Sequence, residues 1–203
     1  MKLTKRLETI LSFVPEKGNI FDIGCDHGIV AVSLALKGRN VTAIDIHEKA
    51  LNKAITLAKE NHVYDQMNFY VHDGIDGIPH KDEDTFIITG MGGYTILHIL
   101  QSEKDGTYIL EAHTDLPFLR REMVKKGFYI KEEKALYDKK WYVIMKWEKG
   151  KKVYSETDYL FGPFCKENKT YMNDMKKKYE TIYKKSNNEE VKKILELIEK
   201  TLK

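Results

Sequence analysis

The fold is decided by residues 20–28, which read IFDIGCDHG. A short, mostly apolar run precedes a loop with two glycines, Gly24 and Gly28, and a second apolar run, residues 29–36, begins directly after it. The first run has the length of a buried strand, and the second, closed by Gly38, has that of a short helix. Glycines at such a turn let the backbone bend tightly and approach a ligand closely. The stretch therefore predicts a strand, a ligand-binding loop and a helix.

The same alternation of short apolar runs and helical patterns continues to about residue 147. Strands are predicted at 20–24, 41–45, 68–72, 85–89, 107–112, 128–136 and 141–147, and helices near 3–14, 29–36, 48–61, 94–100 and 116–126. This α/β order predicts a doubly wound sheet with helices on both faces. The last two strands are expected to pair antiparallel, which makes the sheet mixed. In such sheets ligands bind beyond the carboxyl ends of the strands.

The charge of the chain is concentrated at one end. The 203 residues carry 34 Lys and Arg against 31 Asp and Glu, a net charge of +3. Residues 151–203 hold 13 lysines and 9 acidic residues, whereas residues 1–150 have a net charge of −1. Two apolar stripes, 171–182 and 191–202, flank a polar turn in which Ser186 and Glu189 have capping-box spacing. We expect a helical hairpin or short coiled coil appended to a first domain at 1–150. Its charge fits either a solvated face or a surface that holds a polyanion.

Composition excludes several classes of protein. With 42% hydrophobic and 11% aromatic residues, the chain is expected to be globular. It has no apolar run long enough for a bilayer and no secretory signal. Its two cysteines, Cys25 and Cys165, cannot form a disulfide framework, and its histidines are too scattered to argue for a metal site. We expect a cytoplasmic, reduced protein without a metal.

Acidic residues in the first two loops indicate the kind of ligand. Asp22 stands at the end of the first predicted strand, and Asp45, 21 residues after Gly24, ends the second, where a carboxylate can accept both hydroxyls of a ribose. A nicotinamide dinucleotide would place its pyrophosphate near Asp26, whose charge would repel it. S-adenosylmethionine has no phosphate and carries a sulfonium and an ammonium group. The sign of the charge therefore favours this methyl donor.

Four segments together resemble a known family. They are residues 22–27 (DIGCDH), 90–93 (GMGG), 5–7 (KRL) and 161–163 (FGP). Over nearly its whole length the chain resembles the bacterial tRNA (adenine(22)-N1)-methyltransferases, the TrmK family. The resemblance implies a class I, Rossmann-like, S-adenosylmethionine-dependent methyltransferase domain with a helical C-terminal extension. It also implies methylation of N1 of adenine 22 in the D-arm of tRNA.

The chain departs from the family pattern at three places. Gly28 stands where a small residue such as Ala is expected, and Asp45 stands where Glu is frequent. Residues 110–113 read Leu-Glu-Ala-His where the family tends toward Gln-Pro-Asn.

The predicted donor site is a set of residues at the strand ends. It consists of Asp22, Gly24, Cys25, His27, Gly28, Asp45, Ile46, Asp73, Gly74, Gly90, Gly92 and Gly93. Asp73 is expected to accept the exocyclic amine of the donor's adenine, although an aspartate before a glycine also suits a plain turn. His27 either steadies the loop or packs beside the sheet. Cys25 is interpreted as a small core residue, because methyl transfer to nitrogen needs no covalent intermediate.

Catalysis at adenine N1 needs alignment more than activation. N1 has a free lone pair at pH 7, so the enzyme mainly has to place it in line with the methyl group. A paired adenine must first leave its stack. The methylated base is cationic until its amine loses a proton, and a carboxylate would stabilise that charge. Asp26 is the candidate, with Met91 and Tyr94 shaping the base pocket. The alternative is that Asp26 caps the following helix.

The substrate is expected to be held by basic side chains outside the donor site. The predicted RNA-binding residues are Arg6, Lys176, Lys177, Lys178, Lys184 and Lys185. A monomer is expected. Two other functions remain open: a methyltransferase of the same fold that acts on a small molecule and dimerises through its tail, and a non-catalytic RNA-binding protein.

Overall fold

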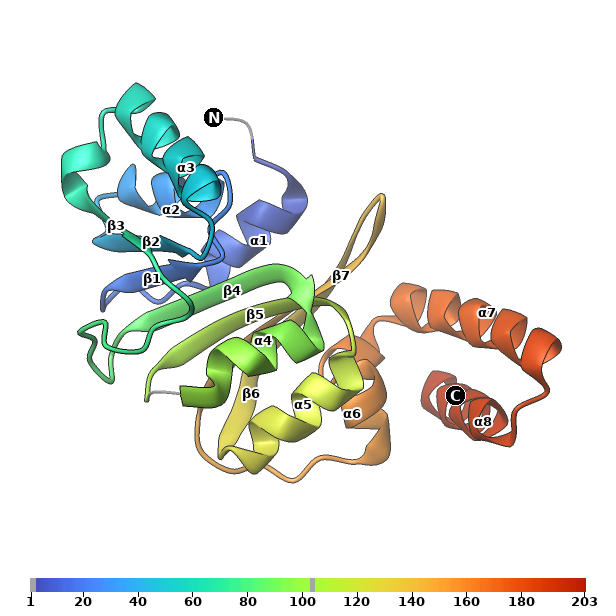
Figure 1. Ribbon diagram of the computed structural model, residues 1–203. Helices are drawn as coiled ribbons and strands as arrows, with labels where there is room; N and C mark the ends of the chain where they lie inside the picture. Colours follow the sequence, from blue (N-terminus) through green and yellow to red (C-terminus); the bar gives the residue numbers. More distant parts are fainter. Residues whose placement is uncertain (1–2, 103–104) are drawn as a thin grey trace.

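The computed structural model describes residues 3–102 and 105–203, and its centre is one seven-stranded sheet (Figure 1). The strands lie in the order β3-β2-β1-β4-β5-β7-β6. Their bounds are β1 Ile20–Ile23, β2 Val41–Asp45, β3 Met67–Val71, β4 Thr85–Gly92, β5 Thr107–Thr114, β6 Phe128–Asp138 and β7 Lys140–Lys149. Strands β1 to β5 are parallel, and β7 is antiparallel to both β5 and β6. The predicted mixed α/β sheet is confirmed.

Helices cover both faces of the sheet, as the alternation of strands and helices predicts. Helices α1 Lys5–Phe13, α2 Ile29–Ala35 and α3 Glu48–Glu60 pack on one face, and α4 Gly93–Ile99 and α5 Leu116–Lys125 pack on the other. Alternate strand residues supply the two cores, because successive side chains of a strand point to opposite faces. Ile87 lies in the first core and Phe86 in the second, both fully buried.

The C-terminal segment is a helical hairpin that is anchored in the second core. It contains α6 Glu156–Phe161, the short 3-10 turn η3 Cys165–Glu167, α7 Lys169–Ser186 and α8 Glu189–Leu202. Two further 3-10 turns, η1 Tyr64–Gln66 and η2 Leu100–Ser102, occur in the body. Phe161, Cys165, Tyr171, Met172 and Ile198 are buried in the same cluster as the sheet residues. The expected hairpin is confirmed, and its root shares a core with the sheet, so the division at residue 150 stays a prediction.

Two local expectations differ from the structure. Ser186 does not cap α8: it ends α7, and its hydroxyl donates to the carbonyl of Ile182. The α8 cap is Asn188, whose side chain accepts from the amide of Glu190. The capping-box prediction was wrong because α7 includes Ser186, so that only Asn187 and Asn188 separate the two helices.

The glycine segment 90–93 also differs from its predicted form. Strand β4 continues through Gly92 with a bulge against β5, and α4 begins at Gly93. Gly90 and Gly92 are thus strand residues and Gly93 is the first residue of a helix, so the segment is not a separate loop. No helix in the described ranges is long and apolar enough to cross a membrane.

Candidate active site

A cleft of about 840 Å³ lies at the carboxyl ends of the parallel strands. It collects most of the predicted site. The predicted residues that line it are Arg6, Asp22, Gly24, Cys25, Asp26, His27, Asp45, Ile46, Asp73, Gly74, Gly90 and Met91. Gly28, Gly92, Gly93, Tyr94 and the five tail lysines do not line it. The cleft also has lining residues that the sequence did not indicate, among them Thr95, His98 and His113.

The first loop is shaped by glycines with two different tasks. Gly24 has a φ of +71°, and a Cβ there would meet the methyl group of Met91, so Met91 lies directly over Gly24. Gly28, also at +71°, faces α3: its Cβ would lie 2.5 Å from the Cβ of Ala54. Gly24 therefore serves the cleft itself, whereas Gly28 permits the close packing of α2 on α3.

Asp45 ties the first two loops together. One of its carboxylate oxygens accepts the amide of Asp26 at 3.1 Å, and the other accepts the amide of His47 at 2.9 Å. The residue is buried at the wall of the cleft. A carboxylate oxygen can accept more than one hydrogen bond. Asp45 can therefore hold the loop and still accept from a ligand hydroxyl.

The acid at the end of β1 is held in an unusual state. Asp22 is only 4% exposed, and its carboxylate accepts the amide of Ala31 in the first turn of α2 at 3.2 Å. Burial raises its pKa to about 7, against the opposing effect of that hydrogen bond and with a small addition from Asp45. Burial likewise raises the pKa of the Cys25 thiol, which keeps it protonated. A protonated, buried thiol fits the predicted packing role of Cys25 and not that of a nucleophile.

Asp26 is exposed and does not cap a helix. Helix α2 has Gly28 at its N-cap with no side-chain hydrogen bond. The carboxylate of Asp26, on a backbone with φ of 46°, instead lies 2.6 Å from Nδ1 of His27. Nε2 of His27 lies 3.2 Å from the Nζ of Lys53. The alternative of a capping aspartate is wrong, because the chain makes a further turn before the helix begins.

Gly92, Gly93 and Tyr94 do not line the cleft, although Met91 and Thr95 beside them do. A Cβ on Gly93 would lie 3.0 Å from the carbonyl oxygen of Asp115, so this glycine permits close packing of α4 on the β5–α5 connection. Tyr94 is 62% exposed, and its ring packs on that of Phe118 with centroids 4.6 Å apart. Tyr94 is not among the residues that line the cleft. Its role in a base pocket stays a prediction.

A buried ion pair is the main feature that the sequence did not indicate. Arg6 of α1 donates through Nε to Oε2 of Glu111 at 2.9 Å, and the amide of Gly90 donates to the same oxygen at 3.1 Å. Glu111 is fully buried in β5, and Arg6 is partly exposed at the cleft. In the sequence, Glu111 is a lone acidic residue within the mostly apolar run 107–112, which could have suggested a buried charge. Its partner could not be inferred, because Arg6 lies 105 positions away. In this structure Arg6 is engaged with Glu111.

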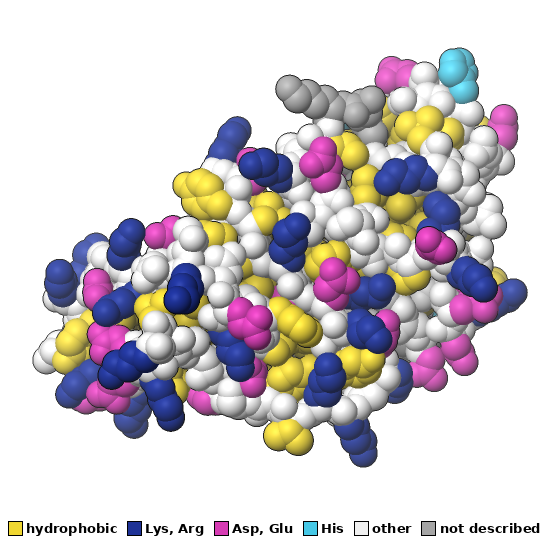
Figure 2. All heavy atoms as spheres, turned by 180° about the vertical axis from the view of Figure 1, so that it is seen from behind, with side chains coloured by type: hydrophobic (Ala, Val, Ile, Leu, Met, Phe, Trp, Pro, Cys, Tyr) yellow, Lys and Arg dark blue, Asp and Glu magenta, His cyan; other side chains and the backbone are white. Residues whose placement is uncertain are grey.

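The tail lysines lie on α7, and their environments differ. Lys176 pairs with Glu199 of α8 at 2.9 Å and Lys177 with Asp174 at 3.4 Å. Lys178, Lys184 and Lys185 form no ion pair with the described residues. Seen from behind, the hairpin carries lysines interleaved with acidic side chains (Figure 2). Among residues 3–102 and 105–203, no group of three or more His, Cys, Asp or Glu is arranged to hold a metal ion.

The fold and the cleft together define a class of protein. The chain belongs to the methyltransferase domain family, whose model matches residues 3–145. It is 26% identical over 183 residues to the tRNA (adenine(22)-N(1))-methyltransferase of Bacillus subtilis, covering 83% of this chain and 77% of that protein.

Solved structures extend the likeness to the tail. The structure of Mycoplasma capricolum TrmK in complex with S-adenosylhomocysteine superposes with a TM-score of 0.88 at 24% identity, covering 100% of this chain and 98% of that one. Bacillus subtilis TrmK gives 0.84 at 21% identity, covering 100% and 99%. The predicted resemblance to the TrmK family and the predicted Rossmann-like fold are confirmed.

Proposed function

We propose that this protein transfers a methyl group from S-adenosylmethionine to N1 of adenine 22 in the D-arm of tRNA. The observation that carries the proposal is the cleft in which Asp22, Asp26 and Asp45 lie together with Gly90 of β4. Its acidic lining suits a cationic donor, and the likeness to the adenine-22 methyltransferase of Bacillus subtilis covers most of the chain. This activity implies a cytoplasmic, RNA-binding enzyme of tRNA processing. We propose that it acts as a monomer without a metal.

The residues of the cleft fit the donor group by group. Asp45 is buried at the wall, where it can accept from ribose hydroxyls. Asp73 and Gly74 follow β3 and line the cleft, and we propose that they contact the donor's adenine. Position 24 has no room for a side chain, because the methyl group of Met91 lies directly over it. When bound, the donor supplies an electrophilic methyl group on a sulfonium, and a nearby ionised Asp22 would favour the cation.

The remaining task of the protein is to hold the acceptor in line. Met91 lies over Gly24, just beyond the point where the pairing of β1 with β4 ends at Ile23 and Ile88. The exposed carboxylate of Asp26 lies at the same loop and can stabilise positive charge on the methylated base. Asp26→Ala should therefore lower turnover about 100-fold, or ~2.7 kcal/mol, and change donor affinity little. Turnover near that of the wild type would show that Asp26 is not catalytic and only holds the loop through His27.

Methylation of unmodified tRNA tests the function directly. The purified protein is incubated with unmodified tRNA and isotopically labelled S-adenosylmethionine, and the digested nucleosides are separated by mass. We expect labelled 1-methyladenosine, and none with a tRNA that carries guanine at position 22. Absence of 1-methyladenosine from every tRNA would overturn the proposal.

Two further measurements separate the alternatives. Failure to bind the donor would favour a non-catalytic RNA-binding protein. Donor binding without salt-sensitive affinity for RNA would favour a small-molecule methyltransferase whose hairpin serves dimerisation.

A further inference from the structure

One carboxylate at the cleft has an oxygen that the protein does not use. Oε2 of Glu111 accepts from Arg6 and from the amide of Gly90, whereas Oε1 has no hydrogen-bond partner among the described residues. The side chain is fully buried, so water does not reach this oxygen. Buried polar atoms are rarely left unpaired, and one beside a functional cleft calls for a reason.

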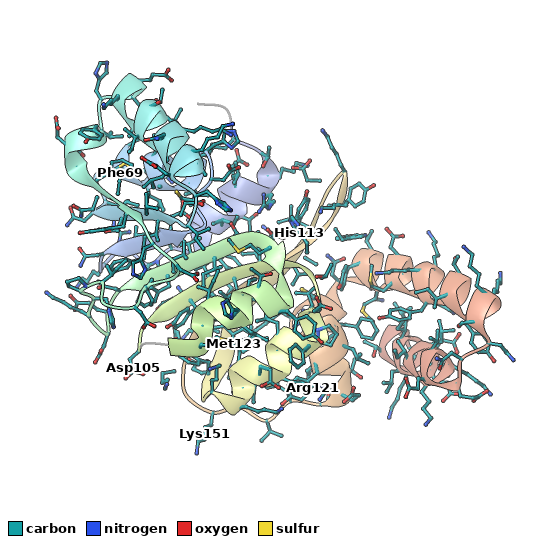
Figure 3. The ribbon with its side chains drawn as sticks, in the orientation of Figure 1. Phe69, Asp105, His113, Arg121, Met123 and Lys151 are labelled. Carbon is teal, nitrogen blue, oxygen red and sulfur yellow. The ribbon has the colours of Figure 1, made fainter. Side chains whose placement is uncertain are left out.

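A histidine that lines the cleft lies close to that oxygen. Nε2 of His113 lies 3.4 Å from Oε1 of Glu111, and the two residues, two apart in β5, point to the same face of the sheet. The imidazole is 35% exposed and packs edge-on against Tyr142 of β7, with centroids 6.0 Å apart. Figure 3 shows His113 at the carboxyl end of β5, at the edge of the sheet where the cleft opens. The ring therefore lies between Glu111 and Tyr142 and is partly exposed.

The strand order assigns this histidine to the acceptor rather than to the donor. Asp45 and Asp73, the expected contacts of the donor's adenosine, follow β2 and β3, on one side of β1. His113 ends β5, beyond β4 on the opposite side. Along this edge the methyl group is expected near Met91, between the adenosine contacts on one side and His113 on the other. A base that receives the methyl group therefore lies on the His113 side.

We propose that His113, positioned by Glu111, recognises the exocyclic amine of the target adenine. Nε2 faces the Glu111 carboxylate across 3.4 Å, which favours the tautomer with its proton on Nε2. In that tautomer Nδ1 has a lone pair, which can accept a hydrogen bond from that amine. Guanine places a carbonyl oxygen at the same position, and two lone pairs would then face each other. His113 would in this way select adenine by its amine. The inference rests on the proposed function and adds a specificity residue to it.

The test removes the hydrogen bond from each side in turn. Two tRNAs are prepared, one with adenine and one with purine, which lacks the amine, at position 22. Methylation is measured as kcat/KM for the wild type, His113→Ala, His113→Asn and the control His62→Asn, a histidine that does not line the cleft. Donor binding is measured by calorimetry for each variant.

The expected result is a loss confined to one substrate. His113→Ala should lower kcat/KM for the adenine tRNA about tenfold, or ~1.4 kcal/mol, and leave the purine tRNA and donor binding unchanged. His113→Asn should recover part of the loss, because its carboxamide oxygen also accepts. Equal losses on both tRNAs, or no loss on either, would overturn the inference while the proposed function stands. If the wild type methylates neither tRNA, the proposed function fails, and this inference fails with it.

Discussion

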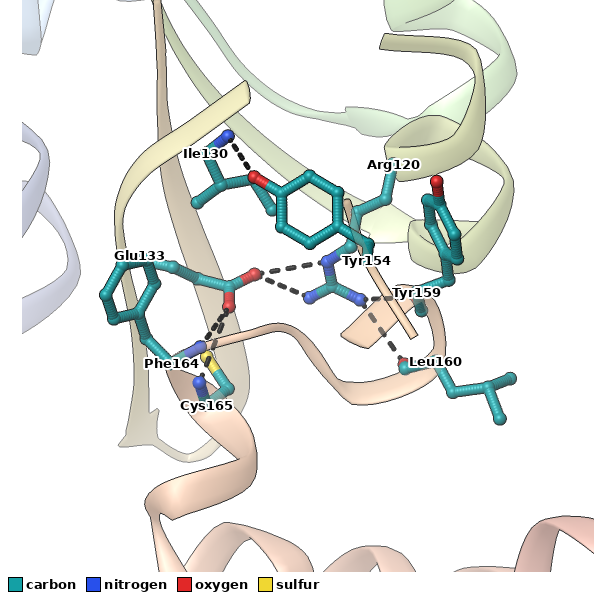
Figure 4. A network of polar contacts seen from close by, with 8 residues as sticks. All are labelled: Arg120, Ile130, Glu133, Tyr154, Tyr159, Leu160, Phe164 and Cys165. Atoms are coloured by element: carbon teal, nitrogen blue, oxygen red, sulfur yellow. Dashed lines mark hydrogen bonds and ion pairs between the residues drawn. The ribbon is translucent and has the colours of Figure 1, made fainter. Parts of the chain in front are cut away.

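The structure contains an arginine–glutamate pair at the root of the hairpin and another at the cleft. In the first pair both carboxylate oxygens accept hydrogen bonds, whereas in the second only one does. At the root, Arg120 donates to one oxygen of Glu133 at 2.7 and 3.1 Å and to the carbonyls of Tyr159 and Leu160. The other oxygen of Glu133 accepts the amides of Phe164 and Cys165 at 3.4 Å each (Figure 4).

At the cleft, Arg6 is partly exposed and Glu111 keeps one oxygen without a hydrogen bond to the described residues. The two pairs therefore differ in how many of their carboxylate oxygens the fold uses. A pair with both oxygens in use joins elements of the fold, here α5, β6 and the segment after α6. In the second pair one carboxylate oxygen faces His113, a residue that lines the cleft.

The largest expected effect is on stability at the root. Arg120→Met leaves the carboxylate of Glu133 buried without its ion-pair partner, which should lower the free energy of unfolding by about 3–5 kcal/mol. Denaturant unfolding measures the change. The control is Arg121→Met, which removes an exposed pair with Glu156 and should cost about 1 kcal/mol or less. If Arg120→Met unfolds at the denaturant concentration of the wild type, this pair does not join the elements as described.

A smaller loss of stability is expected at the cleft. Arg6→Met removes the cation from Glu111, but the amide of Gly90 still donates to that carboxylate and the cleft admits water. The free energy of unfolding should fall by about 1–3 kcal/mol, less than for Arg120→Met. The same denaturation series measures both variants. Equal costs at the two sites would remove the distinction between a complete and an incomplete pair.

Asp22 gives the cleft a pH dependence. Its pKa of about 7 means that its carboxylate is mostly protonated at pH 6 and half ionised at pH 7. A cationic donor favours the ionised form, so donor affinity should rise about fivefold between pH 6 and pH 7. The free protein should respond in the opposite direction. Because the unfolded chain releases this proton near the ordinary value of 3.8, the contribution of Asp22 to stability falls as pH rises from about 4 to 7.

Calorimetric titration with the donor at the two pH values measures the effect. Asp22→Asn, which cannot ionise, should bind with an affinity that no longer changes over this range. A wild-type affinity that is flat from pH 6 to pH 7 would show that Asp22 does not face the cationic part of the donor.

The smallest expected effect is in the hairpin beyond the root. Replacing Lys178, Lys184 and Lys185 with Ala should weaken tRNA binding and reduce the slope of log affinity against log salt by about 0.7–0.9 for each phosphate that the variant no longer neutralises. Lys176→Ala with Lys177→Ala should change the slope less, because both lysines already pair with acids. Binding measured at several salt concentrations tests this. If the two sets change the slope equally, the ion pairs on α7 do not limit contact with RNA.

The features that could be predicted are those that depend on residues close together in the sequence. Val41–Asp45 was predicted with its bounds, and Asp22, Gly24 and Asp45 were predicted to share one edge because parallel strands end on the same side. The helix-forming stripes of the hairpin were likewise visible in the spacing of their apolar residues. What could not be predicted needs distant partners: the packing of Gly28 on Ala54, and the burial of Glu111 against Arg6.

Local sequence patterns are therefore enough to predict the class of fold, the edge of the sheet that carries the site and the acidic character of that site. Periodicity and loop glycines are local properties, and they suffice to order strands and helices along the chain. The tertiary structure alone decided which charges are free. Arg6 and Arg120 are both basic residues in helices, and only the folded structure shows that each pairs with a buried glutamate, Glu111 or Glu133. The physical reason is that the energy of a charge depends on its surroundings, which segments distant in the sequence assemble.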